Sequence, residues 1–95
     1  MAGVEGPVGT ADAGDALQAA YYRGVLADER EQVAVNLTHS RARLRACADR
    51  EKVVGLRAMA RLRADVRALE NRHRDLDRLI AALDRRFATV WAREG

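Results

Sequence analysis

A repeating pattern of apolar residues in the second half of the sequence limits its fold more than any other feature. From Met59 to Val90, the pattern recurs at alternating steps of three and four residues for more than four heptads, and nine of its ten positions are apolar. Such a pattern is typical of a helix that packs along one side against another helix. We call these positions, together with the adjacent Trp91, the seam: Met59, Leu62, Val66, Leu69, His73, Leu76, Ile80, Leu83, Phe87, Val90 and Trp91.

Charged residues lie between the seam positions at helical spacing, for example Glu70 before Arg74 and Asp75 before Arg78. Each such pair stabilises a helix by only about 0.2 to 0.5 kcal/mol, whereas burial of one large apolar side chain contributes roughly 1.5 to 3 kcal/mol. The seam is therefore expected to determine the fold. The branched Val66 and Ile80, combined with leucines at most of the alternate positions, favour a two-stranded coiled coil.

The first half of the sequence carries a fainter line with the same spacing: Leu26, Arg30, Val33, Leu37, Ser40, Leu44, Cys47, Glu51 and Val54. Its register slips by one residue near Gly55, beside the charged run 49–52. We therefore predict an all-α chain of two long helices, about 12–48 and 55–92, folded into an antiparallel helical hairpin with a break within 48–55. Two alternatives remain open: a turn at 36–40, where helix propensity is poor, or one continuous helix.

Residues 1–11 are rich in Gly, Ala and Val and include Pro7, which predicts a flexible N-terminal arm before a single helical domain, 12–93. A chain of 95 residues buries a modest core, so a partner surface is expected. We expect the seam to pair with a second copy, as a homodimer or small bundle, or with another helical protein. The sequence does not determine whether that pairing is parallel or antiparallel.

Three residues with reactive side chains are interpreted as structural. His73 interrupts the seam, where a polar residue fixes the register of a coiled coil, and its neighbourhood lacks a second His or Cys for a metal site. In a dimer formed through the seam, two copies of His73 would lie close together, and protonation would weaken the association. His39 is expected to be solvated, and Cys47 to act as a small buried hydrophobe. We expect no catalytic residue, metal, cofactor or small-molecule substrate.

The segment 41–63 is strongly basic, with eight basic side chains against Asp49 and Glu51. The basic residues are Arg41, Arg43, Arg45, Arg50, Lys52, Arg57, Arg61 and Arg63. Such a segment can contact phosphates, but no aromatic residue lies within it to stack on bases. An ordinary solvated surface, or docking to an acidic protein surface, is therefore preferred over binding of nucleic acid. Arginine outnumbers lysine 16 to 1, which is typical of a GC-rich genome and favours a bacterial source.

One run resembles a known enzyme family. Residues 74–86, with the sequence RDLDRLIAALDRR, are similar to the first-helix pattern of the all-helical chorismate mutases, in which Leu-Asp precedes spaced aliphatic residues and arginines. In that family the helix opens the domain and two further helices complete the pocket, whereas here the run lies near the end of the sequence. The resemblance implies a helical enzyme, which we keep as a remote alternative.

The sequence favours a non-enzymatic coiled-coil interaction module that serves as an oligomerisation, adaptor or scaffold component of a larger assembly. The alternative is a basic helical protein that binds nucleic acid. The first twenty residues carry three carboxylates and no continuous apolar run, and no stretch of 18 apolar residues exists, so we expect a cytoplasmic protein without a membrane span. The biological partner and pathway are not encoded in any motif that we recognise.

Overall fold

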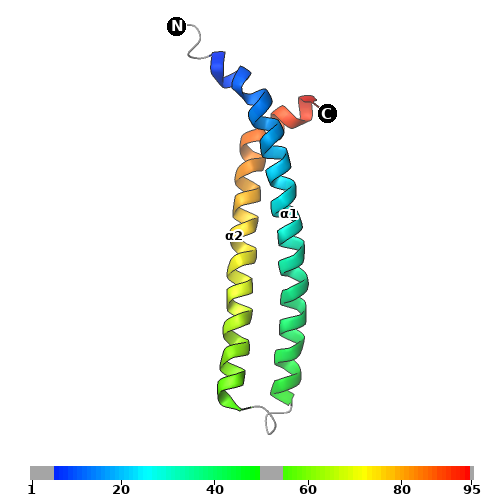
Figure 1. Ribbon diagram of the computed structural model, residues 1–95, viewed down its shortest axis with the longest axis vertical. Helices are drawn as coiled ribbons and strands as arrows, with labels where there is room; N and C mark the ends of the chain where they lie inside the picture. Colours follow the sequence, from blue (N-terminus) through cyan, green and yellow to red (C-terminus); the bar gives the residue numbers. More distant parts are fainter. Residues whose placement is uncertain (1–5, 50–54, 95) are drawn as a thin grey trace.

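The computed structural model describes the backbone of residues 6–49 and 55–94 and the side chains of residues 14–49 and 55–93. Two helices, α1 (Gly6–Asp49) and α2 (Leu56–Glu94), account for nearly all of this part of the chain. They run antiparallel, side by side, in an elongated hairpin of 71 × 25 × 15 Å (Figure 1). The predicted all-α antiparallel hairpin is thereby confirmed.

The connection between the helices lies where the sequence places it. Helix α1 ends at Asp49, and α2 begins at Leu56 after Gly55, whose carbonyl oxygen accepts a hydrogen bond from the Met59 N–H at 3.1 Å. The connection between the helices, 50–55, falls within the predicted interval 48–55, and 50–54 lie outside the described residues. The alternatives of a turn at 36–40 and of one continuous helix are therefore wrong.

Helix α1 also continues through the segment of poor helix propensity at 36–40. Leu37 is buried, and the Thr38 hydroxyl donates a hydrogen bond to the Ala34 carbonyl oxygen at 3.0 Å. Packing of Leu37 against α2 and this internal bond outweigh propensity differences of at most about 0.7 kcal/mol per residue. Local propensity is a weak signal here because tertiary packing decides the conformation.

The start of α1 differs from the prediction. The helix begins at Gly6, whereas the sequence analysis extends the N-terminal arm to about residue 11. Pro7 lies in the first turn, where the missing N–H costs nothing because the first four N–H groups of a helix have no internal partner. Residues 6–11 were expected to belong to the flexible arm, but they form the first turns of α1. Residues 1–5 lie outside the described part.

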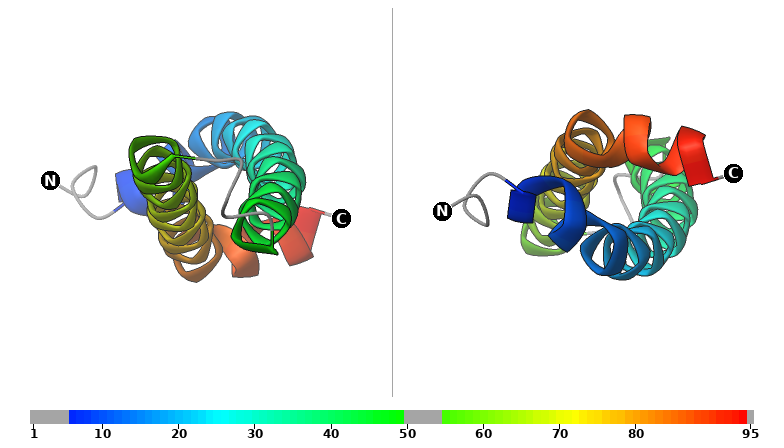
Figure 2. Two further views of the ribbon diagram at one scale, coloured as in Figure 1. Left: turned by 90° about the horizontal axis from the view of Figure 1, so that it is seen from below. Right: turned by 90° about the horizontal axis from the view of Figure 1, so that it is seen from above.

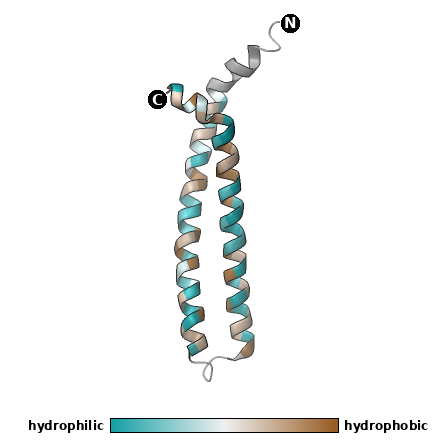
Figure 3. Cartoon of the chain, turned by 180° about the vertical axis from the view of Figure 1, so that it is seen from behind, coloured by the Kyte–Doolittle hydropathy of each residue, from teal (hydrophilic) through white to brown (hydrophobic). Residues whose placement is uncertain are grey.

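The core consists of one layer of side chains between the two helices. Its central cluster contains Leu26 and Val33 of α1 with Leu76 and Ile80 of α2, and Leu76 is fully buried. A second cluster lies near the open end, where Ala16 and Ala19 pack against Phe87. Small residues on α1 therefore face large ones on α2 at this end. Figure 3 shows hydrophobic residues recurring along both helices among hydrophilic ones.

Ion pairs between the helices reinforce the antiparallel register. They join Arg23 to Asp84, Glu29 to Arg72, Arg30 to Asp77 and Arg41 to Glu70, with N–O distances from 2.6 to 3.1 Å. The Arg23 guanidinium holds the Asp84 carboxylate with two hydrogen bonds, which lower the pKa of Asp84 and raise the pKa of Arg23. These side chains are partly exposed to solvent, so the pairs contribute more to alignment than to stability.

The two helices diverge at the open end of the hairpin, where the first turns of α1 and the last turns of α2 point in different directions (Figure 2). Trp91 joins them just before they part, because its indole N–H donates a hydrogen bond to the Ala16 carbonyl oxygen at 2.9 Å. The Trp91 ring also stacks on Phe87, with 5.8 Å between ring centroids. This aromatic contact fixes the open end.

Candidate interaction surfaces

The structure places the seam of α2 against α1 of the same chain. Met59, Val66, Leu76, Ile80 and Phe87 are buried. The other seam residues are half-buried: Leu62, Leu69, His73, Leu83, Val90 and Trp91. Because α1 already covers the seam, the apolar side chains that predicted an interaction surface form the interior of the hairpin. Pairing with another chain through the seam stays a prediction, and it would require α1 to be displaced.

His73 lies in the seam and faces its own chain. Its side chain is half-buried, and its Nδ1 atom lies 3.4 Å from an Asp77 carboxylate oxygen, one helical turn away. Asp77 is in turn held by Arg30 of α1 at 3.1 Å. This arrangement makes His73 part of the polar edge between the helices. In the described part of the chain, no three His, Cys, Asp or Glu side chains lie close enough together to hold a metal ion.

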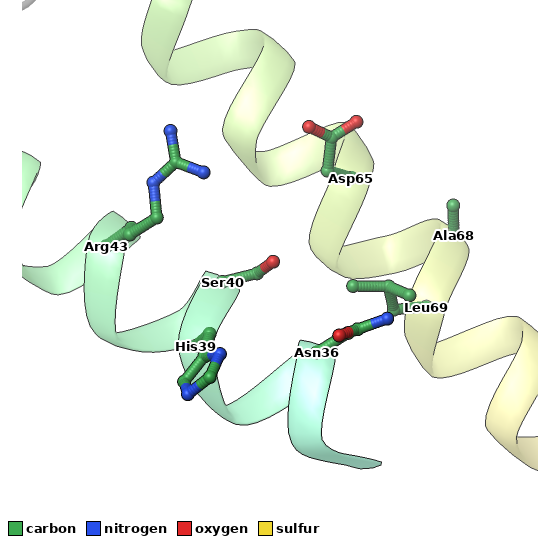
Figure 4. Close-up of a pocket in the computed structure, with 7 residues that line it drawn as sticks. All are labelled: Asn36, His39, Ser40, Arg43, Asp65, Ala68 and Leu69. Carbon is green, nitrogen blue, oxygen red and sulfur yellow. The ribbon is translucent and has the colours of Figure 1, made fainter. Parts of the chain in front are cut away.

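A shallow groove runs between the helices toward the closed end of the hairpin (Figure 4). Asn36, Ser40 and Arg43 of α1 face Asp65 and Leu69 of α2 across it. The groove continues past Cys47, which is half-buried. The groove is wide and open to solvent, and its lining contains both acidic and basic side chains. It therefore provides a surface for side chains of a partner and lacks the enclosure that a small-molecule site needs.

The basic residues of 41–63 gather at the closed end from both helices. Arg41, Arg43 and Arg45 lie on the last turns of α1, and Arg57, Arg61 and Arg63 lie on the first turns of α2. Arg41 is paired with Glu70 at 2.9 Å, while Arg43 and Arg61 line the groove beside Cys47. Arg50 and Lys52 lie outside the described residues. The fold thus brings together six arginines from two segments at one end of the hairpin.

An exposed apolar surface that the sequence analysis did not single out lies on α1. Leu17 is 75% exposed, Tyr21 is 77% exposed and Val25 is 43% exposed. They are spaced four residues apart, so they share the side of α1 opposite to the buried Ala16 and Leu26. We call Leu17, Tyr21 and Val25 the outer patch. Its side chains are turned away from α2, and those of Leu17 and Tyr21 lie mostly in solvent.

The segment around the outer patch contains unusually few charged residues, a feature that was not used in predicting the interaction surface. Residues 16–27, with the sequence ALQAAYYRGVLA, contain a single charged side chain, Arg23, which pairs with Asp84 of α2. A solvent-facing helix surface of this length normally carries several charges. Helix α1 therefore has one apolar side that packs against α2 and a second apolar side, the outer patch, that α2 does not cover.

The run 74–86 that resembles the chorismate mutases lies in the middle of α2. Leu76, Ile80 and Leu83 of this run pack into the central core, and Asp84 pairs with Arg23. Asp75 and Arg78 form an ion pair with each other on the surface. The three aliphatic residues and the three charged residues of this run named here therefore serve the packing and surface of the hairpin. The enzyme that the resemblance implies stays untested.

None of the described helices is long and apolar enough to cross a membrane. The chain matches no known protein family, no curated protein and no solved structure.

Proposed function

We propose that this protein is a non-enzymatic helical interaction module, which serves as an oligomerisation, adaptor or scaffold component of a larger assembly. In this proposal the seam holds the hairpin together, and the outer patch of α1 binds the partner. The observation that carries the proposal is the exposure of Leu17 and Tyr21 on a helix side that carries no charge between residues 16 and 22. Adjacent apolar side chains exposed in this way mark surfaces that bind other proteins.

The arrangement of the two apolar surfaces supports this assignment. Residues of the seam stabilise the hairpin by intramolecular burial, so substitutions there affect folding first. Residues of the outer patch contribute little to folding because they remain in water. A surface that costs solubility without stabilising the fold is expected to have a binding role.

The test compares Leu17→Glu combined with Tyr21→Glu against Leu56→Glu. Leu56 is 88% exposed at the opposite end of the hairpin, so it controls for the removal of an exposed leucine. We expect the double variant to keep its circular dichroism spectrum but to lose association, both with itself by sedimentation and with proteins retained from the native host. The Leu56→Glu variant should retain both. Equal association in all three proteins, or none in the wild type, would contradict the proposal.

The closed end supports a second candidate, a protein that binds nucleic acid through phosphates. The specific observation is the convergence of Arg43 and Arg61 on one groove, with Arg45, Arg57 and Arg63 nearby. Binding to mixed-sequence DNA or RNA should then weaken steeply between about 50 and 200 mM salt. Replacing Arg43 and Arg61 with glutamine should reduce both the affinity and the salt dependence. Absence of binding at low salt excludes this candidate.

A further inference from the structure

A second line of residues with coiled-coil spacing runs along α1 on the side turned away from α2. Starting at Tyr21, its positions alternate steps of four and three, and every one of them is exposed. We call it the outer line: Tyr21, Val25, Asp28, Gln32, Val35, His39, Ala42 and Ala46. Steps of three and four keep residues on one side of a helix in register with a neighbouring helix. The spacing thus suits a second long helix lying along α1.

The outer patch alone is too small to hold such a helix. Stable interfaces between proteins bury about 1,600 Å² in total, and one aromatic side chain supplies only about 150 to 250 Å² of it. The three side chains of the outer patch therefore cannot form a stable interface without further contacts. The partner must run along much of the 44 residues of α1, over the whole outer line.

The spacing of the positions in the outer line is the same in both directions along the helix. In an antiparallel pair of outer lines, the bulky Tyr21 and Val25 lie opposite Ala46 and Ala42 of the second copy. In the same register Asp28 lies opposite His39 of the second copy, and Gln32 lies opposite Val35. All eight positions find a partner from the same set, as a two-fold symmetric interface requires. A parallel pair would instead place Tyr21 on Tyr21 and Asp28 on Asp28.

Charges beside the outer line favour the same direction. The first half of the outer line, 21–33, exposes Asp28 and Glu31, and the second half, 34–46, exposes Arg43 and Arg45; Asp49 follows as an acidic exception at the end of α1. An antiparallel arrangement brings the acidic half of one helix next to the basic half of the other, whereas a parallel arrangement brings like charges together. Opposed charges fix the register of an interface by disfavouring the wrong one.

We propose that the partner of the outer line is a second copy of this chain, bound antiparallel, so that the two α1 helices form the centre of a four-helix assembly with α2 on the outside. This inference rests on the proposed function and specifies its partner. The seam keeps its place inside each hairpin, and His73 of one copy stays far from that of the other. The dimer therefore differs from the one that the seam predicted.

Distances between spin labels on the two copies test the direction and the register. Labels are attached at Ala20→Cys or at Thr38→Cys in a Cys47→Ala background, because both sites are exposed and lie beside the outer line. At about 1.5 Å per residue, the proposed register places labels at 20 about 40 Å apart and labels at 38 less than about 20 Å apart. A parallel dimer would give two short distances. A dimer held by the outer patches alone would give a short distance at 20 and a long one at 38.

A charge exchange provides an independent test in solution. His39→Asp should weaken dimerisation by at least about tenfold, because it places a second carboxylate opposite Asp28 at both ends of the interface. Asp28→Lys should weaken dimerisation less, because it only removes the carboxylate opposite His39. The double variant should recover most of the affinity. In a parallel dimer the exchange restores nothing, since position 28 meets position 28. Both positions are exposed, so circular dichroism should show intact helices in every variant.

The outcomes separate this inference from the proposed function. Spin-label distances of a parallel or patch-only dimer, or failure of the double variant to recover, overturn the inference. A wild-type chain that stays monomeric at about 100 µM overturns it as well. If that monomer still binds a host protein through Leu17 and Tyr21, the proposed function stands while the second copy is excluded. If it binds nothing, both fail.

Discussion

The two helices of the hairpin differ in how their apolar residues are distributed. In α2 the large apolar residues follow the seam, and only Leu56 and Leu79 are exposed among those described. In α1 five large apolar side chains are exposed: Leu17, Tyr21, Tyr22, Val25 and Val35. Helix α2 is therefore built for one neighbour, whereas α1 has an apolar surface on two sides. The difference supports the proposal that α2 completes the hairpin and that α1 binds the partner.

The largest expected effect on stability comes from comparing a buried leucine of α2 with an exposed leucine of α1. Leu76 is fully buried in the central core, so Leu76→Ala should reduce the free energy of unfolding by about 2 to 5 kcal/mol. Leu17→Ala should change it by no more than about 0.5 kcal/mol. Chemical denaturation of both variants under identical conditions measures the two effects. Similar losses would mean that the outer patch supports folding, which contradicts the proposed division between the helices.

A smaller effect of opposite sign is expected at Gly24 on α1. A Cβ atom at this position would meet no atom within 4 Å, and the glycine lies inside a helix. Gly24→Ala should therefore raise the free energy of unfolding by about 0.5 to 1 kcal/mol, mainly by restricting the unfolded chain. Gly14→Ala, which is equally unobstructed but nearer the helix end, serves as the matched variant. Thermal unfolding by circular dichroism should show a higher midpoint for Gly24→Ala, and a lower one would show that α1 has a neighbour at this position.

The smallest effect concerns pH and the ion pair between the helices. Pairing with Arg23 lowers the pKa of Asp84 in the folded state, so the folded protein binds fewer protons than the unfolded chain. The pair therefore stabilises the fold above the unfolded carboxyl pKa of about 4, and this contribution disappears as pH falls through the lowered value. Asp84→Asn should remove that part of the acid dependence between about pH 5 and 2.

The matched control for this measurement is Asp75→Asn, because the Asp75 ion pair lies within α2 and does not join the helices. Stability curves of the two variants and the wild type against pH provide the comparison. If Asp84→Asn keeps the acid dependence of the wild type, the contact between Arg23 and Asp84 does not persist in solution.

The sequence predicted α2 better than α1, and the reason lies in the residues of each line. Nearly every seam position of α2 is a large apolar residue, so its period is unambiguous. The line on α1 was recognised from Leu26 onward, but it continues backward through Arg23, Ala19 and Ala16, all of which contact α2. Alanines carry little hydrophobic signal and an arginine carries none, so this part of the core could be found only from the structure.

The sequence predicts an interaction surface along the seam, and pairing of another chain there stays a prediction. A heptad line shows that a helix has a partner but does not say which helix it is. Met59, Leu69 and Leu76 were interpreted as facing another chain, although the fainter line on α1 of the same chain covers them. Once α1 is assigned to that role, Leu17 and Tyr21 remain without a partner. Sequence alone could have located them by the absence of charge in 16–22.

All four aromatic residues of the chain, Tyr21, Tyr22, Phe87 and Trp91, lie toward the open end of the hairpin. Near-ultraviolet absorption and tryptophan emission therefore report on that end alone, while far-ultraviolet dichroism averages over both helices. When the open end separates before the rest, the optical signal of Trp91 will change at a lower temperature than the helical signal. Comparing the tryptophan signal with the helical signal therefore shows whether the hairpin unfolds as one unit or opens first at the end that holds Trp91.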